Sequence, residues 1–461
     1  MNKGNDVPID FTDPIFTSAN RELLSPKFSE DALATRFTDR YVSNLRYVAA
    51  WRRWMHHDGA RWAEDSTLKV WDRIRAICRE AAEESLVIEQ KPALAKHLTS
   101  GHTVSAIEFL ARCDSRTAAT IDQWDADPMA LNTFNGVTCD LHTGITRAHQ
   151  PEDYATKSTR VTPAKGDCPL WRKFLERITA GDGELQGYLQ RAAGYCLTGI
   201  TSEQVLFFAY GKGANGKSTF SSTLLGICGD YAQTAQMETF TENKHERHST
   251  ELAALRGARL VVASETEVGK RWAESRIKAL TGGDPVRAHF MRCDDFEFVP
   301  QFKLWVQGNH RPGLRSVDEA IRRRLHLIPF TVTIPPHERD PKLSDKLRAE
   351  WPQILAWALE GCVLWQREGL NPPAAVRDAT DEYLNSEDAL ASWMDECVIQ
   401  SPQAGTTKTS LLYQNFKLWA ERTGEYCGSQ KRFSQDLKDR GFVIRESHGK
   451  VIDGIALRDD G

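Results

Sequence analysis

The stretch at residues 205–220, VLFFAYGKGANGKSTF, joins an apolar run directly to a turn rich in glycine. Its Gly211, Gly216, Lys217 and Ser218 satisfy the pattern G-x-x-x-x-G-K-[ST]. Glycines at these places let the backbone fold tightly, so that its N–H groups converge on an anion at the start of the next helix. We therefore predict a nucleotide-binding strand, loop and helix rather than an ordinary glycine turn. The residues expected to contact ATP, or another nucleoside triphosphate, are Gly211, Gly213, Ala214, Asn215, Gly216, Lys217, Ser218 and Thr219.

Composition limits the partners of this loop. The chain has 461 residues, enough for two or three domains, and its formal net charge of -4 gives no global attraction to nucleic acid. A polyanion site must therefore be a local groove or pore. The ten cysteines are scattered without a C-x-x-C pair, which indicates neither a zinc knuckle nor a disulfide framework. No apolar run is long enough to span a bilayer, so we expect a cytoplasmic protein without a membrane partner.

The chain divides into three predicted regions. Residues 1–165 mix helical and strand patterns, and residues 166–385 contain the loop with helical flanks. In that second region the strand-like runs RLVVAS and FKLWVQG alternate with helical segments, which favours an α/β core with a parallel sheet. Residues 386–461 form a separate small module.

The first region opens with a predicted helix. Its apolar positions are Leu33, Phe37, Tyr41, Leu45 and Val48. A tryptophan-rich stretch follows, and we expect its Trp51, Trp54 and Trp62 to belong to the core rather than to platforms for stacking bases. Asn-Gly and Thr-Gly turns in FNGVTCDLHTGI then predict a small hairpin structure.

Two candidates for hydrolytic chemistry follow apolar strands. Glu265 and Glu267 come directly after RLVVAS, and Asn309 comes after FKLWVQG. Strand-end carboxylates at this edge of a parallel sheet lie beside the phosphate loop, where hydrolysis needs Mg²⁺ and a group that orients water. Either glutamate fits the metal-side acid or the base, and the alternative is a pair of solvated acids. An amide at Asn309 can sense the γ-phosphate, or it can be a simple turn former.

Basic residues mark two further sites. In DEAIRRRLHLIPF, three arginines precede an apolar strand, and a guanidinium there can stabilise transition-state charge across a subunit boundary. That interpretation requires a ring, whereas the alternative is a solvated basic face. Between residues 282 and 298, a glycine turn and alternating phenylalanines predict a hairpin with Arg287, His289 and Arg292 near its tip. Inside a ring such a hairpin would touch a threaded single strand; otherwise it is an ordinary surface hairpin.

Taken in order, GKGANGKST, ASETE, KALTGGD with Arg287, LWVQGN and IRRRLHLIPF closely resemble the superfamily 3 helicases. The likeness is to the helicase part of the phage and plasmid primase-helicase family, which includes poxvirus members. The stretches WRRWMHHDGARWAED, LNTFNGVTCDLHTG and ILAWALEGCVLWQREGLNPPAAV extend it over most of the chain. The resemblance implies an AAA+ type core, a hexameric or heptameric ring, and ATP-driven 3′ to 5′ movement on single-stranded and replication-fork DNA of a mobile element.

The resemblance also implies roles for individual residues. Lys217 would bind the β- and γ-phosphates, Ser218 and Glu265 would hold Mg²⁺, and Glu267 would share the acidic strand end. Asn309 would be the polar sensor, and Arg323 or Arg324 the finger that reaches a neighbour's ATP. The residues that would face DNA are Lys278, Arg287, His289 and Arg292.

The chain departs from the family in one respect. Many relatives carry a primase domain first, but here only about 160 residues precede the helicase part, without zinc-binding cysteines. Asp125 and Asp127 suggest paired metal ligands, yet they adjoin a stretch that matches the pre-helicase region, so we interpret them as structural. We expect a separate primase or polymerase to make primers, in the cytoplasm of a bacterial host.

The tail fits the outline of a winged helix. Two predicted helices, the second stopped by Gly441, are followed by two strands around His448 and Gly449. Its DNA-facing candidates are Lys431, Arg432, Lys438 and Arg440. The alternative is a protein-docking or purely structural module.

Two rival functions share the phosphate loop. An ATP-regulated assembly or switch would bind nucleotide without unwinding DNA, and a basic hairpin argues against it. A small-molecule phosphotransferase would be a monomer with a lid, and it leaves the three arginines and the terminal module without a use.

Overall fold

The computed structural model describes residues 26–242, 249–264, 270–290, 294–314, 317–401, 405–446 and 450–458. The chain forms two compact units, which interleave in sequence. The first contains residues up to 127 together with 132–139 and 146–158. The second contains residues 128–131 and 140–145 and the chain from residue 159 onward. Each unit is described by itself.

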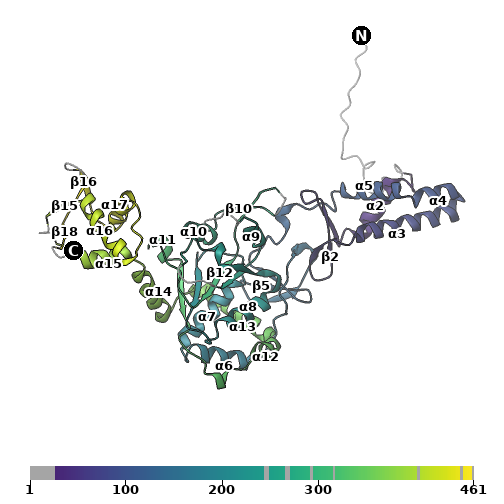
Figure 1. Ribbon diagram of the computed structural model, residues 1–461. Coiled ribbons are helices and arrows are strands. Elements are labelled where there is room, and N and C mark those ends of the chain that lie inside the picture. The colour runs from purple at the N-terminus through teal and green to yellow at the C-terminus, as the bar shows by residue number, and fades with distance from the viewer. Residues whose placement is uncertain are drawn as a thin grey trace, which may run out of the picture. The chain divides into compact units, whose positions relative to one another are not determined.

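The first unit combines a helical layer with small antiparallel sheets (Figure 1). Its helices are α2 (Glu30–Tyr41), α3 (Lys69–Glu84), the π-helix η2 (Ser85–Glu89), α4 (Pro92–Leu98) and α5 (Gly101–Arg112). The three-stranded sheet has the order β1 (Leu45–Val48), β2 (Arg53–His57) and β3 (Trp62–Glu64). Helices and sheet meet around buried Phe37, Leu45 and Ile74.

Part of the predicted first helix is wrong. Helix α2 ends at Tyr41, and Leu45 and Val48 lie in strand β1. The four-residue apolar spacing suits a helix, but pairing of β1 with β2 satisfies the same backbone groups and still buries both side chains. The predicted core position of Trp54 and Trp62 is confirmed, since both are buried.

Other expectations for the region before the phosphate loop hold in outline. The hairpin of FNGVTCDLHTGI is confirmed by strands β4 (Ala130–Thr133), β5 (Val137–Asp140) and β6 (Thr146–Ala148). Its tight turn uses Asn135 and Gly136, both with positive φ. Asp125 accepts a hydrogen bond from the backbone of Thr156 at 2.8 Å, as a structural residue does.

The second unit is built around a five-stranded parallel sheet. Its strands are β7 (Leu206–Tyr210), β8 (Ala232–Gln236), β9 (Leu260–Ser264), β12 (Lys303–Gly308) and β13 (Leu325–Pro329). They lie side by side in the order β13-β7-β12-β9-β8. The runs LFFA and LVVA are buried along their length, as expected for parallel strands covered on both faces. The predicted α/β core with a parallel sheet, preceded by a mixed α and β region, is confirmed.

Helices cover this sheet (Figure 1). They are α6 (Pro169–Ile178), α7 (Gly183–Cys196), α8 (Lys217–Cys228), α9 (Ser249–Ala254), α10 (Glu274–Gly282), α11 (Glu319–Arg322), α12 (Leu343–Ala349), α13 (Trp351–Glu368) and α14 (Ala374–Ser386). Helices α7 and α13 pack so closely that a Cβ on Gly194 would lie 2.0 Å from the backbone nitrogen of Cys362. On the sheet, Phe220 of α8 stacks between Trp171 of α6 and Trp305 of β12, at 5.5 and 5.2 Å between ring centroids. These contacts fix the helix that follows the phosphate loop.

The C-terminal residues form their own core of helices and short strands. The helices are α15 (Ala389–Cys397), α16 (Thr409–Thr423) and α17 (Gln430–Asp439). The strands are β14 (Val398–Gln400), β15 (Thr406–Lys408), β16 (Ile444–Glu446), β17 (Lys450–Asp453) and β18 (Ile455–Leu457). Trp393, Phe416 and Phe433 pack together inside. The predicted helices and the β16–β17 pair are present, whereas His448 and Gly449 lie outside the described residues.

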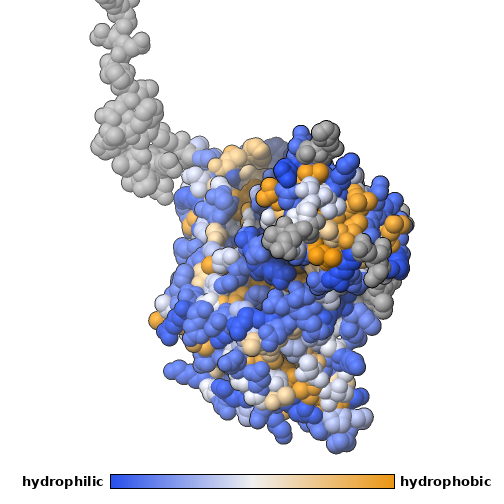
Figure 2. All heavy atoms as spheres, turned by 90° about the vertical axis from the view of Figure 1, so that its left-hand side faces the viewer, coloured by the Kyte–Doolittle hydropathy of each residue, from blue (hydrophilic) through white to orange (hydrophobic). Residues whose placement is uncertain are grey.

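The side of the molecule drawn in Figure 2 carries apolar patches within a mainly hydrophilic surface. In the C-terminal module the exposed large apolar residues are Ile399, Leu411, Leu418 and Val443. Within the described part of the chain, no helix combines the length and apolar character needed to cross a membrane.

Candidate nucleotide site and its flanking surfaces

The phosphate loop connects β7 to α8 in a conformation that requires glycine at two places. Gly211 has φ +152°, and a Cβ there would lie 2.2 Å from the carbonyl oxygen of Phe330. Gly216 has φ +90°, and a Cβ there would lie 2.4 Å from Ile178 of helix α6. Neighbouring backbone and side chains therefore enclose the loop on both sides, and any larger residue would displace it.

Lys217 is held inside this loop. The residue is only 6% exposed. Its Nζ donates hydrogen bonds to the carbonyl oxygen of Gly211 at 2.5 Å and to Asn215 Oδ1 at 3.2 Å. Lys217 Nζ also donates a hydrogen bond to Oδ1 of Asn309, which lies 92 positions later in the chain, at 3.3 Å. These three acceptors are neutral oxygens, and an anionic phosphate oxygen binds an ammonium group more strongly. The site therefore fits a nucleotide phosphate.

Residues 330–334, which follow β13, hold the loop from the outside by two hydrogen bonds. The segment after β13 is tied to it by the backbone N–H of Ile334, which donates to the Ala214 carbonyl at 2.8 Å. Asn215 donates from Nδ2 to the carbonyl of Phe330 at 3.0 Å. The sequence motif includes Asn215 only as an unspecified position, so its contact with the end of β13 could not be predicted from the motif.

A hydrogen-bonded chain runs across the strand ends beside Ser218. Ser221 Oγ donates to Gln307 Oε1 at 2.9 Å, and Gln307 Nε2 donates to Ser264 Oγ at 2.9 Å. With Ser218 these residues line a cavity of about 370 Å³. Ser264 ends β9, but Glu265 and Glu267 lie outside the described residues. Ser218 and Glu265 offer the hydroxyl and carboxylate oxygens that suit Mg²⁺. No cluster of three or more His, Cys, Asp or Glu suited to a metal occurs among the described residues.

The candidate finger arginines differ in their surroundings. Arg324 is 6% exposed, and it donates from Nε to Thr281 Oγ1 at 3.2 Å and from Nη1 to the Ala320 carbonyl at 2.8 Å. Burial lowers the pKa of its guanidinium from the ordinary value. Arg323, in contrast, is exposed. The geometry therefore gives Arg324 a structural role within its own chain and leaves Arg323 able to reach another molecule.

The predicted hairpin is formed by β10 (Val286–Ala288) and β11 (Phe296–Phe298), which pair antiparallel. One carboxylate lies against two of its basic side chains: Arg287 Nη2 lies 2.7 Å from Asp295 Oδ2, and His289 Nδ1 lies 3.3 Å from Asp295 Oδ1. Arg292 lies outside the described residues. Sequence reasoning did not single out Asp295, although an acid beside basic residues in the same hairpin was a visible signal.

Lys278 on α10, another predicted DNA contact, forms an ion pair with Asp318. Asp318 also caps α11 by accepting a hydrogen bond from the backbone of Ile321 at 2.8 Å. The lysine therefore joins α10 to the helix that leads into Arg323 and Arg324.

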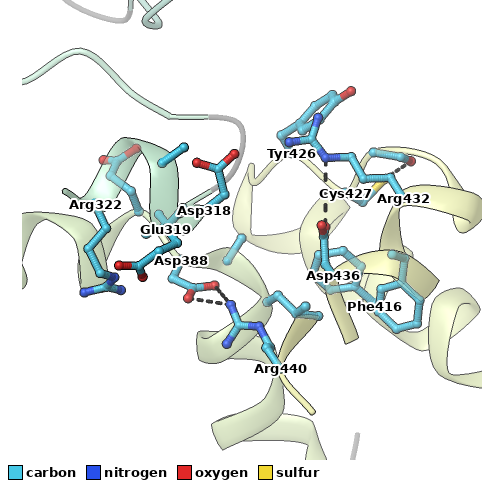
Figure 3. A pocket seen from close by; sticks show the side chains of 17 residues that line it. Asp318, Glu319, Arg322, Asp388, Phe416, Tyr426, Cys427, Arg432, Asp436 and Arg440 are labelled. Carbon is cyan, nitrogen blue, oxygen red and sulfur yellow. Dashed lines mark hydrogen bonds and ion pairs between the residues drawn. The ribbon is translucent and has the colours of Figure 1, made fainter. Parts of the chain in front are cut away.

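In the C-terminal module, two of the four predicted DNA-facing cations are also paired (Figure 3). Arg440 lies 2.5 Å from Asp388, and Arg432 lies 3.9 Å from Asp436. The two arginines and the two aspartates of these pairs line a cavity of about 540 Å³, which α11 also borders. Lys431 and Lys438 are exposed.

A larger cavity, of about 900 Å³, adjoins the phosphate loop. Its walls come from α6, from the loop and the start of α8, from the segment after β13 and from the start of α12; they include Leu170, Phe174, Arg177, Ala214, Gly216, Thr219, Ile334, Glu338 and Leu343. Of these residues, only Ala214, Gly216 and Thr219 are among the predicted nucleotide contacts. The others were missed because they come from α6, from the irregular segment after β13 and from the start of α12, and these meet only in the tertiary fold.

An α/β domain with a phosphate-loop motif and polar strand ends is the class that fold and site define. Residues 34–180 match the family described as D5 N terminal like. Residues 209–324 match a second family, described as a family of unknown function, DUF5906.

Named relatives are viral. A provisionally named helicase of Acanthamoeba polyphaga mimivirus is 27% identical over 324 residues, which cover 64% of this chain and 33% of that protein. A provisionally named helicase of Frog virus 3 (isolate Goorha) is 26% identical over 326 residues, which cover 66% of this chain and 33% of that protein. This chain thus spans about a third of the length of these curated relatives.

The fold is also similar to a solved structure, the apo structure of the NrS-1 C-terminal region. The TM-score is 0.54 at 10% identity, and the match covers 93% of this chain and 99% of the other. Together, the two family matches, the viral relatives and this fold confirm the predicted resemblance to the superfamily 3 helicases of phages and viruses.

Proposed function

We propose that this chain is an AAA+ type ATPase that assembles into a ring and drives single-stranded DNA through it, 3′ to 5′, during replication of a phage, plasmid or other mobile element. The observation that carries the proposal is the contact of Lys217 with Asn309 beside the enclosed phosphate loop. A lysine inside the loop and an amide at the next strand end are the groups that bind a γ-phosphate and respond to its loss. The relatives named as helicases support the same function.

ATP would exchange places with the neutral acceptors of Lys217. Its phosphate oxygens take the ammonium group, which frees the Asn309 amide to hydrogen-bond the γ-phosphate or the attacking water. Ser218 and Glu265 would hold Mg²⁺, which neutralises phosphate charge when it is bound. Glu267 and Glu265 remain alternative bases. Hydrolysis then changes the partners of Asn309, at the end of a strand in the central sheet.

Hydrolysis would be completed by a neighbouring copy of the chain. Exposed Arg323 is our candidate for the guanidinium that reaches the γ-phosphate of the next subunit. Arg324 would hold Arg323 in place through its bonds to Thr281 and Ala320. The ring would have six or seven members.

DNA would be contacted by Lys278, Arg287, His289 and Arg292. Phosphate oxygens can replace Asp295 as the partner of Arg287 and His289, because these side chains are at the surface. One observation favours the alternative of an ATP-regulated assembly without unwinding: Asp295 already pairs with Arg287 and lies beside His289. A separate primase or polymerase would supply primers.

The test is strand displacement from duplexes that carry a single-stranded tail at either the 3′ or the 5′ end. We expect unwinding only with the 3′ tail on the translocating strand, only with ATP and Mg²⁺, and none by Lys217→Ala. Lys417→Ala, which alters an exposed lysine of α16, is the matched control and should unwind normally. ATP hydrolysis without displacement of either duplex would instead support the switch function.

A further inference from the structure

The cavity of about 900 Å³ beside the phosphate loop has apolar walls on which a flat heteroaromatic ring can pack, together with charged side chains such as Lys173 and Arg339. Phe174, Ile334 and Leu343 supply apolar wall from three different elements, while Ala214 and Gly216 connect the cavity to the loop. Ligand cavities typically combine such apolar walls with a few polar groups. Continuity with the loop means that one ligand can occupy both, with its phosphates on the loop and its ring in the cavity.

One ion pair joins two walls of this cavity. Arg177, in the last turn of α6, places Nε 2.8 Å from Glu338 Oε2, at the end of the 3-10 turn η7 (Pro336–Glu338). Both residues line the cavity and both side chains are 41% exposed. The pair therefore lies at the solvent side of the cavity and not in its interior.

The two ends of α6 are held in different ways. At its start, the backbone N–H groups of Leu170 and Trp171 donate to the carboxylate of Glu350 at 3.1 and 2.9 Å. Hydrogen bonds to a partly buried carboxylate are among the stronger ones. Near its end, the exposed Arg177–Glu338 pair is of the weak kind that exchanges readily with solvent. The wall formed by α6 is thus held firmly, whereas the Arg177–Glu338 pair that joins it to the opposite wall can open and form again.

We propose that this cavity takes the base and ribose of the nucleotide, and that the Arg177–Glu338 pair closes over them and sets how long the nucleotide stays bound. The inference rests on the proposed ATPase function and adds to it the nucleoside site and the residues that control nucleotide release. In a motor of this kind, breaking the pair would shorten the time that each subunit holds nucleotide.

The cavity is tested by comparing two ligands, ATP and inorganic tripolyphosphate, by calorimetry on the full chain. Ile334→Ala trims the wall, while the backbone N–H that holds Ala214 remains. We expect ATP to bind about tenfold more weakly and tripolyphosphate to bind as before, because only the nucleoside loses a contact. Equal weakening of both ligands, or of neither, overturns the nucleoside site.

The ion pair is tested by stopped-flow dissociation of a fluorescent, ribose-labelled ATP. Arg177→Gln and Glu338→Gln should each speed release about threefold, the double variant should be no faster than either, and the exchanged pair Arg177→Glu with Glu338→Arg should restore slow release. Arg172→Gln is the matched control: Arg172 lies on the same helix in an exposed pair with Asp167 at 2.7 Å, but away from the cavity.

Unchanged release in both single variants, or equal acceleration in Arg172→Gln, overturns the role of the pair. If the unmodified protein binds neither ATP nor tripolyphosphate, it is the proposed ATPase function that fails. The two failures are therefore distinguishable in the same set of measurements.

Discussion

The phosphate loop and the β10–β11 hairpin both present cations, but they hold them in opposite ways. Lys217 is only 6% exposed, and oxygen atoms of its own chain position its ammonium group. The Arg287 side chain is 72% exposed and is paired with a carboxylate at the surface. The loop therefore holds its lysine in position without a ligand. In the hairpin, the charge of Arg287 is balanced by Asp295, and a polyanion must compete with that carboxylate.

This difference separates what one chain can do alone from what needs an assembly. In the proposed function the nucleotide phosphates have their partners within one polypeptide, so ATP binding should not depend on other copies. Arg323, Arg287 and His289 are at the surface, so the roles proposed for them require a second subunit or DNA. Variants at the loop should therefore abolish activity outright, and variants at the surface should act through assembly or DNA.

The largest expected effect is at Lys217. Lys217→Ala should lower the rate of ATP hydrolysis by about a thousandfold or more, because the ammonium group that neutralises phosphate charge is lost. Circular dichroism should show an unchanged fold. ATP hydrolysis by this variant at the wild-type rate would contradict the assignment of the loop.

The second effect contrasts neighbouring arginines. Arg323→Ala should lower hydrolysis by about a thousandfold without loss of stability, the effect of losing a finger that acts on a neighbour's ATP. Arg324→Ala should instead lower the free energy of unfolding by about 1–3 kcal/mol, because Thr281 and Ala320 lose a buried partner. Equilibrium denaturation with urea distinguishes the two.

A mixing experiment extends this contrast. Arg323→Ala and Glu265→Gln proteins, each inactive, should regain some hydrolysis when mixed, because their defects lie on opposite sides of a shared site. Mixed assembly must first be demonstrated with differently tagged chains. Without recovery in confirmed mixed rings, a finger that acts between subunits is ruled out.

A smaller effect is the dependence of folding stability on pH, which arises from a histidine in the central sheet. Burial lowers the pKa of His326 on β13 to about 4, and its Nδ1 lies 2.8 Å from the hydroxyl of Tyr188. Below pH 6.5 the imidazole of His326 binds a proton in the unfolded chain, but in the folded chain it binds one only near pH 4. The free energy of unfolding therefore falls as the pH falls from 6.5 to 4. At pH 5 the loss should be about 2 kcal/mol relative to pH 7.5. In His326→Gln this part of the pH dependence should disappear, and its persistence would refute the cause given.

The smallest effect is at the hairpin. Asp295→Asn should raise affinity for a single-stranded oligonucleotide about threefold at low salt, since Arg287 and His289 no longer have a competing carboxylate. The gain should shrink as salt rises. Fluorescence anisotropy measures both trends. Asp39→Asn breaks a comparable exposed pair with Arg116 in the first unit and should change nothing; a decrease with Asp295→Asn would favour the switch function.

The same comparison explains what the sequence could predict. Gly211, Gly216 and Lys217 follow from local backbone demands, and parallel strands bring their ends together, which places Asn309 beside the loop. The end of α2 was mistaken because Leu45 and Val48 continue the helical spacing, whereas the strand that buries them needs β2, a partner known only in three dimensions. The separate roles of Arg323 and Arg324, and the meeting of Arg177 with Glu338 161 residues away, depend on the folded chain.

The central claim is most directly tested by ATP hydrolysis in size-exclusion fractions of the purified protein, with and without single-stranded DNA. We predict that DNA stimulates hydrolysis, and that the stimulated activity is confined to the fraction with the size of a ring. Hydrolysis that ignores DNA, or that resides in the monomer fraction, would contradict a ring-shaped DNA motor.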